Sequence, residues 1–219
     1  MHSSAHYRQL LARLPQIAVA ADQFQVLNSA KDFKSRILSL IAGATQRIYL
    51  IALYLQDDEA GREILSALYA AKQRNPALDI KVFVDFHRAQ RGLIGKGKQG
   101  GNHLMYQAMA ARHEHQIEIY GVPVKGRELL GVLHLKGFIF DDILLYSGAS
   151  LNDIYLHQQE RYRFDRYHQI HSQALTCSMV NYVDDVFLKS EAVQRLDRPG
   201  IPGAKQLKGQ IRRFKHNLR

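Results

Sequence analysis

Two apolar runs separated by a helix-like segment constrain the fold of this chain more than any other feature. Residues 47–55 (RIYLIALYL) and 79–86 (DIKVFVDF) are almost continuously apolar, which is typical of strands buried on both faces. Between them, Asp57 and Asp58 precede a helical pattern that runs through Gln73, and their charges favour a helix N-terminus. A strand, a helix and a strand at this spacing predict a parallel β-α-β unit.

Helical and extended patterns alternate along the rest of the chain. The sequence predicts a first helix that ends at Pro15, and Ser29, Asn102 and Ser172 are candidate N-caps for further helices. The strands predicted outside the β-α-β unit are Phe24–Leu27, Gln116–Tyr120, Leu133–Phe140 and Ile143–Tyr146. This alternation predicts an α/β fold.

The segment from Gly131 to Asp153 carries the densest chemistry. His134 and Lys136 are two residues apart, so a strand over 133–140 would project both from one face. A histidine nitrogen can attack phosphorus and form a covalent intermediate, and a nearby lysine stabilises charge on the phosphoryl oxygens. The small-residue turn 147–150 and Asn152 offer hydroxyls, an amide and backbone N–H groups to an anion.

Simpler interpretations compete with this chemistry. A single histidine on an apolar strand is more often a core or rim residue than a nucleophile. Lys136 favours a functional site, because a lysine flanked by apolar residues is costly to bury without a partner. Asp141 is either a general acid or a turn residue that accepts hydrogen bonds, and the turn role is preferred.

A basic, glycine-rich stretch follows the second apolar run. Residues 87–102 include Arg88 and Arg91 among several glycines, and ligands of open α/β sheets bind beyond the carboxyl ends of strands. The stretch is either an anion-binding loop or a solvated surface loop. Asp85 and His87 at its start are either an acid–base pair or, preferably, structural or substrate-orienting residues.

Aromatic and basic residues interleave between Asp153 and His171. This pattern suits stacking on nucleic acid, contact with a nucleotide headgroup, or a polar sheet edge. The net charge of +10 also indicates an anionic partner, which could be nucleic acid, an acidic membrane surface or a phosphorylated small molecule.

The expected location is the cytosol. The single cysteine, Cys177, excludes an intrachain disulfide and suits a reducing compartment. No segment approaches the roughly 20 apolar residues that span a bilayer, and the N-terminus does not resemble a signal peptide. No cluster of His, Cys and Asp indicates a metal site, and no cofactor is expected.

The C-terminal region predicts a linker followed by a basic amphipathic helix. Prolines and glycines between Arg198 and Gly203 indicate the linker, and apolar residues recur at helical spacing in 205–219 among many lysines and arginines. Such a helix either lies in an anionic membrane interface or docks its apolar stripe on a protein surface.

The motif residues carry a family resemblance. His134, Lys136 and Asp141, followed by a Gly/Ser turn and Asn152, resemble the His-x-Lys-x4-Asp motif of the phospholipase D superfamily. The stretches LYSGASLNDIYLH (145–157), VDFHRAQRG (84–92) and YGVPV (120–124) resemble the Gram-negative phosphatidylserine synthases of that superfamily. The resemblance covers nearly the whole chain, and it implies a mixed sheet flanked by helices.

The resemblance also implies a reaction. His134 would attack CDP-diacylglycerol, release CMP and hold a phosphatidyl group that serine then accepts. Lys136 and Asn152, with help from Ser150, would stabilise the phosphoryl oxygens. Asp165 best matches the carboxylate that orients a catalytic histidine, and Glu160 is the second candidate. Arg88 and Arg91 are the candidates for binding the substrate headgroup.

Superfamily sites combine two such motifs, whereas this chain carries one copy. A homodimer or a second phospholipase D-like half would complete the site, and the half-enzyme origin is preferred. The predicted domains are a catalytic domain over 1–190, a linker over 191–204 and the helix over 205–219. The synthase would work as a peripheral protein on the inner face of the cytoplasmic membrane.

Two other functions stay open. One is a one-motif phosphodiesterase or nuclease that acts as a homodimer, with nucleic acid as the less favoured partner. The other is a non-catalytic module that binds membrane surfaces and keeps a degenerate motif.

Overall fold

The computed structural model describes residues 4–91, 100–124, 133–160 and 162–217. Within these residues the strands form one eight-stranded mixed sheet in the order β1-β7-β6-β5-β2-β3-β4-β8. The strands in that order are β1 (Phe24–Leu27), β7 (Tyr167–His171), β6 (Ile143–Tyr146), β5 (Gly137–Phe140), β2 (Arg47–Ile51), β3 (Asp79–Asp85), β4 (Glu118–Val122) and β8 (Gln194–Arg195). The predicted α/β fold is confirmed.

The β-α-β unit lies at the centre of the sheet, as the two apolar runs predict. β2 pairs with β3 in parallel, from Arg47 opposite Asp79 to Ile51 opposite Phe83. The connecting helix α3 (Glu59–Arg74) begins after Asp58, whose side chain accepts a hydrogen bond from the Gly61 N–H at 2.9 Å. Both strands are covered on both faces, which explains their apolar character.

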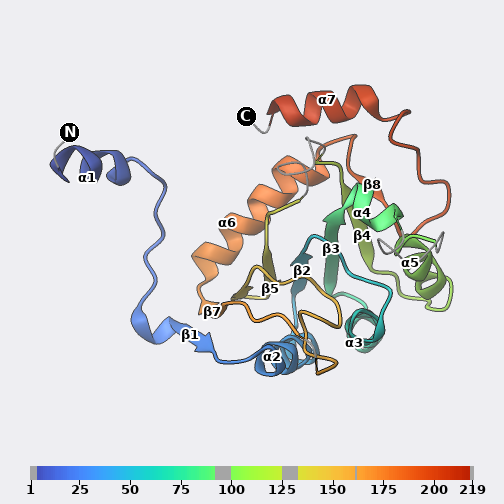
Figure 1. Ribbon diagram of the computed structural model, residues 1–219, viewed down its shortest axis with the longest axis horizontal. Coiled ribbons are helices and arrows are strands. Elements are labelled where there is room, and N and C mark those ends of the chain that lie inside the picture. Colours follow the sequence, from blue (N-terminus) through green and yellow to red (C-terminus); the bar gives the residue numbers. More distant parts are fainter. Residues whose placement is uncertain (1–3, 92–99, 125–132, 161, 218–219) are drawn as a thin grey trace.

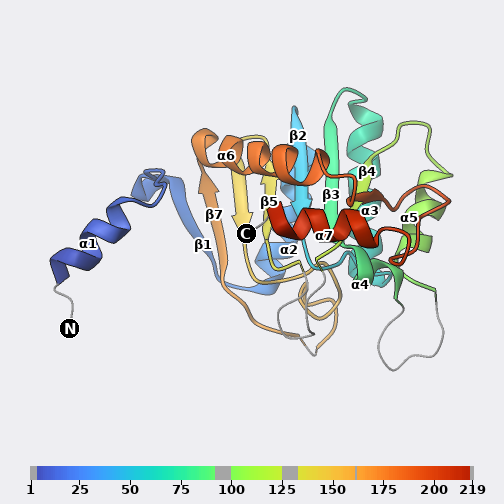
Figure 2. The ribbon, with the colours of Figure 1, turned by 90° about the horizontal axis from the view of Figure 1, so that it is seen from above.

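Helices cover both faces of the sheet (Figures 1 and 2). α2 (Ala30–Gly43) lies beside α3 on one face, where Phe33 stacks on Phe138 of β5 and on Tyr167 of β7. The other face carries α6 (Gln173–Val183), the π-helical turn η2 (Asp184–Leu188) and α7 (Lys208–Asn217). There Phe187 contacts both Phe83 of β3 and Phe214 of α7, so one aromatic column joins the tail to the core.

Three short helices and a 3-10 turn complete the described chain, and one of the helices stands outside the body. The turn η1 (Ala21–Gln23) precedes β1, and α4 (Phe86–Gln90) and α5 (His103–Ala110) follow β3. Figure 1 shows α1 (Ser4–Ala12) projecting from the sheet edge at β1 on an extended connection. Tyr7, Leu10 and Leu11 on this helix are 45–59% exposed.

Two sequence-based boundaries require correction. The strand predicted over 133–140 begins only at Gly137, because that residue has φ +152°, a backbone conformation that side-chain-bearing residues rarely adopt. Part of the range predicted as a linker, 191–204, belongs to the sheet instead. β8 pairs with β4 there, and Leu196 is fully buried.

The tail adopts the docked alternative of the two that its amphipathic pattern allows. Leu207, Ile211 and Phe214 are at most 7% exposed, so the apolar stripe packs on the body of this chain. The stripe is therefore not free to enter a lipid interface. Among the described helices, none has both the length and the apolar character needed to cross a bilayer.

Replacing Phe214 with alanine tests the docking of α7. Because the ring is buried against Phe187, we expect Phe214→Ala to lower the free energy of unfolding by about 3 kcal/mol in urea denaturation. Arg212→Ala, on the exposed side of the same helix, is the control and should change stability by less than about 0.5 kcal/mol. Equal effects of the two substitutions would contradict the docked tail.

Candidate active site

The motif residues gather at one end of the strands of the sheet. The parallel strands β2 and β3 finish at this end, and β5 begins there, with Gly137 opposite Ile51. β6 also finishes at this end, where Tyr146 lies opposite His168 of β7. The chain segments before β5, after β6 and before β7 therefore meet beyond the carboxyl ends of the parallel strands, where ligands bind in α/β sheets.

Asp85 fixes the position of the segment that carries His134. Its side chain is fully buried, and one carboxylate oxygen accepts the N–H groups of His87 and Arg88, each at 2.9 Å. The other oxygen accepts the N–H of Leu133 at 3.1 Å. Burial raises the pKa of Asp85, and these N–H groups oppose that shift by stabilising the carboxylate. The preferred structural role is confirmed.

His134 and Lys136 lie in an irregular segment before β5, so the shared-face argument for a strand does not apply to them. His134 is exposed, whereas Lys136 is partly buried. An exposed imidazole can be reached by a substrate, and this exposure removes the interpretation of His134 as a core residue. Gly137 next to them is confined, because an added Cβ would lie 2.6 Å from Cε of Met179.

Lys136 points at the turn that follows β6. Its Nζ donates a hydrogen bond to the Ser150 hydroxyl at 3.1 Å, and Ser150 is 3% exposed. Burial lowers the pKa of Lys136 to about 8, and the negative charge of Asp165 opposes this shift. The ammonium is therefore mostly charged at neutral pH, although burial disfavours its charge.

Asp165 packs against the turn at Gly148. Its carboxylate accepts the Gly148 N–H at 3.4 Å, and a Cβ at position 148 would lie 2.6 Å from the other carboxylate oxygen. Glycine is therefore required for this close approach. In the described residues Asp165 and His134 form no hydrogen bond with each other, so the predicted orienting contact stays a prediction.

Asn152 supports the turn rather than pointing at Lys136. Its side-chain oxygen accepts the Tyr155 N–H at 3.0 Å, and its amide donates to Gln56 at 3.5 Å. Of the two phosphate-binding candidates in this turn, Ser150 is the one that contacts Lys136.

Asp141 lies at the opposite end of β5, away from the other candidates. Its carboxylate accepts the N–H groups of Thr45, Gln46 and Arg47 at 2.8–2.9 Å. Partial burial alone would raise the pKa of Asp141, but these hydrogen bonds bring it below the ordinary value. The structure gives Asp141 the preferred turn role and separates it from the predicted catalytic set.

The two arginine candidates follow Asp85. Arg88 lies half-buried on α4, and Arg91 is exposed directly after that helix. The glycine-rich residues 92–99 fall outside the described residues, so the predicted anion-binding loop is described only at its ends.

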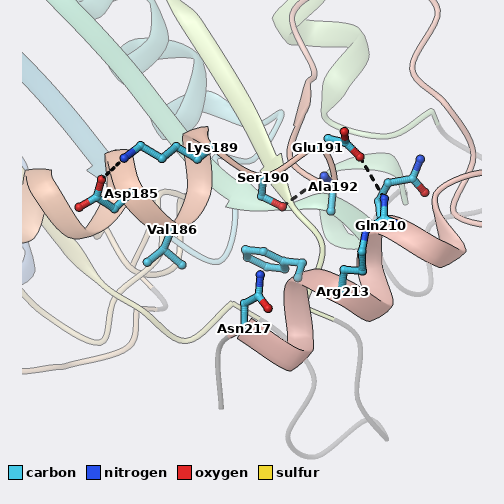
Figure 3. Close-up of a pocket in the computed structure, with 10 residues that line it drawn as sticks. Asp185, Val186, Lys189, Ser190, Glu191, Ala192, Gln210, Arg213 and Asn217 are labelled. Atoms are coloured by element: carbon cyan, nitrogen blue, oxygen red, sulfur yellow. Dashed lines mark hydrogen bonds and ion pairs between the residues drawn. The ribbon is translucent and has the colours of Figure 1, made fainter.

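The cavity drawn in Figure 3 is lined by residues of other segments. It measures about 620 Å³ and lies between α7 and the turn after η2. Its charged side chains are paired, Lys189 with Asp185 at 2.6 Å and Arg213 with Glu191 at 3.0 Å. Since none of the motif residues lines it, this cavity is no extension of the candidate site.

Comparisons with known proteins give a consistent relationship. No family model matches the sequence. The chain is 47% identical over 215 residues to a CDP-diacylglycerol–serine O-phosphatidyltransferase of Haemophilus influenzae, which covers 96% of this chain and 47% of that protein. It is 45% identical over 214 residues to the enzyme of that name from Escherichia coli, which covers 97% of this chain and 48% of that protein.

Solved structures agree with this relationship. The crystal structure of phosphatidylserine synthase from H. influenzae matches with a TM-score of 0.93 and 44% identity, over 100% of this chain and 49% of that one. NucT from Helicobacter pylori matches with a TM-score of 0.52 and 14% identity, over 74% of this chain and 92% of that one, which shows a shared fold alone. The chain is thus related to the synthases over nearly its whole length and spans about half of theirs.

Substituting Asp141 separates a turn role from a catalytic one. We expect Asp141→Asn to lower the free energy of unfolding by about 1–3 kcal/mol near neutral pH, because a carboxylate accepts the three N–H groups better than an amide. A lowered pKa stabilises the folded state above the unfolded value of 3.8 and loses this contribution as the pH falls, so the difference should shrink in acid. Denaturation at several pH values, with Asp142→Asn as control, measures it; a pH-independent difference would contradict the assignment.

Substituting Lys136 should change the free energy of unfolding in the opposite direction, with its pH dependence on the alkaline side. Because burial disfavours the charged lysine, Lys136→Met should raise the free energy of unfolding by roughly 1–3 kcal/mol at pH 7, allowing for partial exposure. The folded protein binds fewer protons than the unfolded chain between pH 8 and 10.5, so wild-type stability should approach that of the variant across this range. Thermal unfolding of both, with the exposed-residue variant Lys31→Met as control, tests this; a constant difference up to pH 11 would refute it.

Proposed function

We propose, from this relationship to the phosphatidylserine synthases, that the chain supplies one motif-bearing half of a phosphatidyltransferase active site. The reaction would convert CDP-diacylglycerol and serine into phosphatidylserine and CMP. One observation carries the proposal: at 45–47% identity to proteins of that activity, the chain places an exposed His134 beside the Lys136–Ser150 pair at the ligand-binding edge of its sheet.

His134 is the proposed nucleophile. One imidazole nitrogen would form a bond to the phosphorus that carries diacylglycerol, and the bond from that phosphorus to the bridging oxygen would break. CMP would leave with the bonding electrons, and the phosphatidyl group would stay on the histidine. The serine hydroxyl would then attack the same phosphorus, lose its proton and restore the free imidazole.

Lys136 and Ser150 are the proposed ligands of the phosphoryl oxygens. Negative charge on these oxygens grows as the nucleophile approaches, so a fixed ammonium and hydroxyl stabilise the transition state more than the ground state. The 3.1 Å hydrogen bond between the two side chains holds the ammonium in place before the substrate arrives. Asn152 contributes by holding the turn, and Asp165 by its charge near Lys136.

The general acid for the leaving CMP is proposed to come from a second motif. Such a motif would be provided by a further phospholipase D-like half, as the doubled length of the relatives suggests, or by a second copy of this chain in a symmetric dimer. In either case residues 1–190, with β8 added to the sheet, would form the catalytic body.

An anionic membrane surface on the inner face of the cytoplasmic membrane is the proposed working environment. The substrate is a lipid, and the net charge of +10 favours attraction to acidic headgroups. Since α7 buries its apolar stripe, the contact would be made by other surfaces. Neither the nuclease nor the non-catalytic module has a specific observation in its favour.

CMP release from CDP-diacylglycerol in mixed micelles tests the proposal. We expect serine-dependent release that falls by at least about 10³-fold in His134→Ala, because the variant lacks the nucleophile. His171→Ala, an exposed histidine that ends β7 at the other end of the strands, is the matched control and should retain full activity.

The purified chain and the chain mixed with a phospholipase D-like half should be assayed side by side. Release by the chain alone would mean that two copies complete the site, and release only by the mixture would mean that the second half is required. Equal release by wild type and His134→Ala in both assays would overturn the proposal.

A further inference from the structure

The described residues 153–160 and 162–164 follow the turn of the candidate site. Arg163 donates its backbone N–H to the carbonyl of Ile154 at 2.9 Å. Asp153 accepts the N–H of Ala60 on α3 at 2.8 Å, and Gln158 contacts Glu59 at 2.6 Å. These contacts attach residues 153–158 to the body of the protein and join Arg163 to them.

The loop also contains a conformation that costs free energy. His157 has φ +50°, in the left-handed region that residues with a Cβ rarely adopt, and its ring stacks on Tyr162 with centroids 3.7 Å apart. Such strain persists only where the surrounding structure fixes it, and it concentrates at functional sites.

Among the described residues of this segment, Arg163 contacts a tyrosine hydroxyl. Its Nη1 donates to the Tyr155 hydroxyl at 3.3 Å, and its guanidinium carbon lies 5.7 Å from the centroid of that ring. Among the described residues, no carboxylate lies within ion-pair distance of Arg163. A guanidinium has five N–H donors, so most of them remain available to an anion.

Two more side chains from other elements share this place. Tyr54 follows β2, and its carbonyl accepts the Leu151 N–H at 3.2 Å, beside the turn that holds Ser150. Burial raises the pKa of Tyr54, and the positive charges of Arg163 and Arg88 oppose the shift. Asp165, two residues after Arg163, abuts the turn that holds Ser150. The segments that carry Tyr54, Arg88, Tyr155 and Arg163 thus adjoin the end of the strands where Lys136 contacts Ser150.

We propose that Arg163 and Tyr155, with Arg88 and Tyr54, bind the phosphate that departs with the nucleotide. This inference rests on the proposed function. A diphosphate ester has two phosphoryl groups, and Lys136 with Ser150 serves the one that is attacked. When the bridging bond breaks, its electrons stay on the nucleotide phosphate, where an arginine fork and phenolic hydroxyls can bind the added charge.

A purely structural role makes a different prediction. If Arg163 only stiffens the loop by packing on Tyr155, its removal should lower the thermal stability of the protein and leave the affinity for phosphate unchanged. If Arg163 binds the departing phosphate, its removal should weaken the binding of CMP and CDP, which both carry that phosphate, and leave cytidine binding unchanged.

Titration calorimetry of the purified chain with CDP, CMP and cytidine separates these roles without turnover. We expect Arg163→Gln to weaken CDP binding by at least about tenfold and to leave cytidine binding unchanged. Tyr155→Phe keeps the ring under the guanidinium and removes only the hydroxyl, so it should weaken CDP binding by a smaller factor. Unchanged thermal unfolding of both variants confirms that the loop is intact.

Arg166→Gln is the matched control, because Arg166 is exposed on the same segment and its contact with Asp165 at 2.7 Å is made by its backbone N–H, which the substitution keeps. It should bind CDP as the wild type does. An equal loss in Arg163→Gln and Arg166→Gln would show general charge attraction and overturn the subsite. So would CDP binding that is unchanged in Arg163→Gln, or absent from the wild-type chain.

His134→Ala keeps failure of the subsite distinct from failure of the proposed function. The variant should bind CMP like the wild type, because the single phosphate of CMP is the departing one and His134 is proposed to contact the attacked phosphorus, which CMP lacks. Normal CMP binding with no turnover in any assay would refute the transferase and keep the phosphate site; turnover without an effect of Arg163→Gln would do the reverse.

Discussion

The hydrogen bonds of the buried Asp85 carboxylate are the contacts on which the candidate site depends. A fully buried carboxylate is costly unless donors surround it, and here three backbone N–H groups do so. Two of the donors begin α4, and the third precedes His134 by one residue. Asp85 is the last residue of β3, an inner strand that pairs in parallel with both β2 and β4. The histidine segment is therefore attached directly to a buried strand of the sheet.

The two ends of the strands in the sheet have different roles. At the end of Asp85, irregular segments approach one another closely, and glycines at 137 and 148 permit contacts that a Cβ would block. At the opposite end, Asp141 satisfies the backbone at the start of β2 and holds the turn after β5. One motif thus contributes residues to both ends of the strands. Those at one end form the candidate site, and Asp141 at the other end stabilises the fold.

Local sequence signals predicted the framework well and the contacts less well. The parallel unit follows from two apolar runs, and Ser29 and Ser172 are N-caps as expected. Asn102 precedes α5, but its side chain makes no capping hydrogen bond. The amphipathic tail was ambiguous, because a stripe shows that a face is buried without showing what covers it. β8 has two residues and no pattern of its own; it exists because β4 offers an open edge. The fit of Asp165 against Gly148 joins residues that only the folded chain brings together.

The projecting helix α1 implies that this chain does not unfold as one cooperative unit. It has nine residues, whereas isolated helices shorter than about 12 residues are only marginally stable in water. Its leucines gain nothing from the core, since they remain exposed. The helical content of α1 is therefore conditional: it can melt while the sheet stays folded, and any surface that covers its leucines raises the stability of that helix without changing the stability of the body.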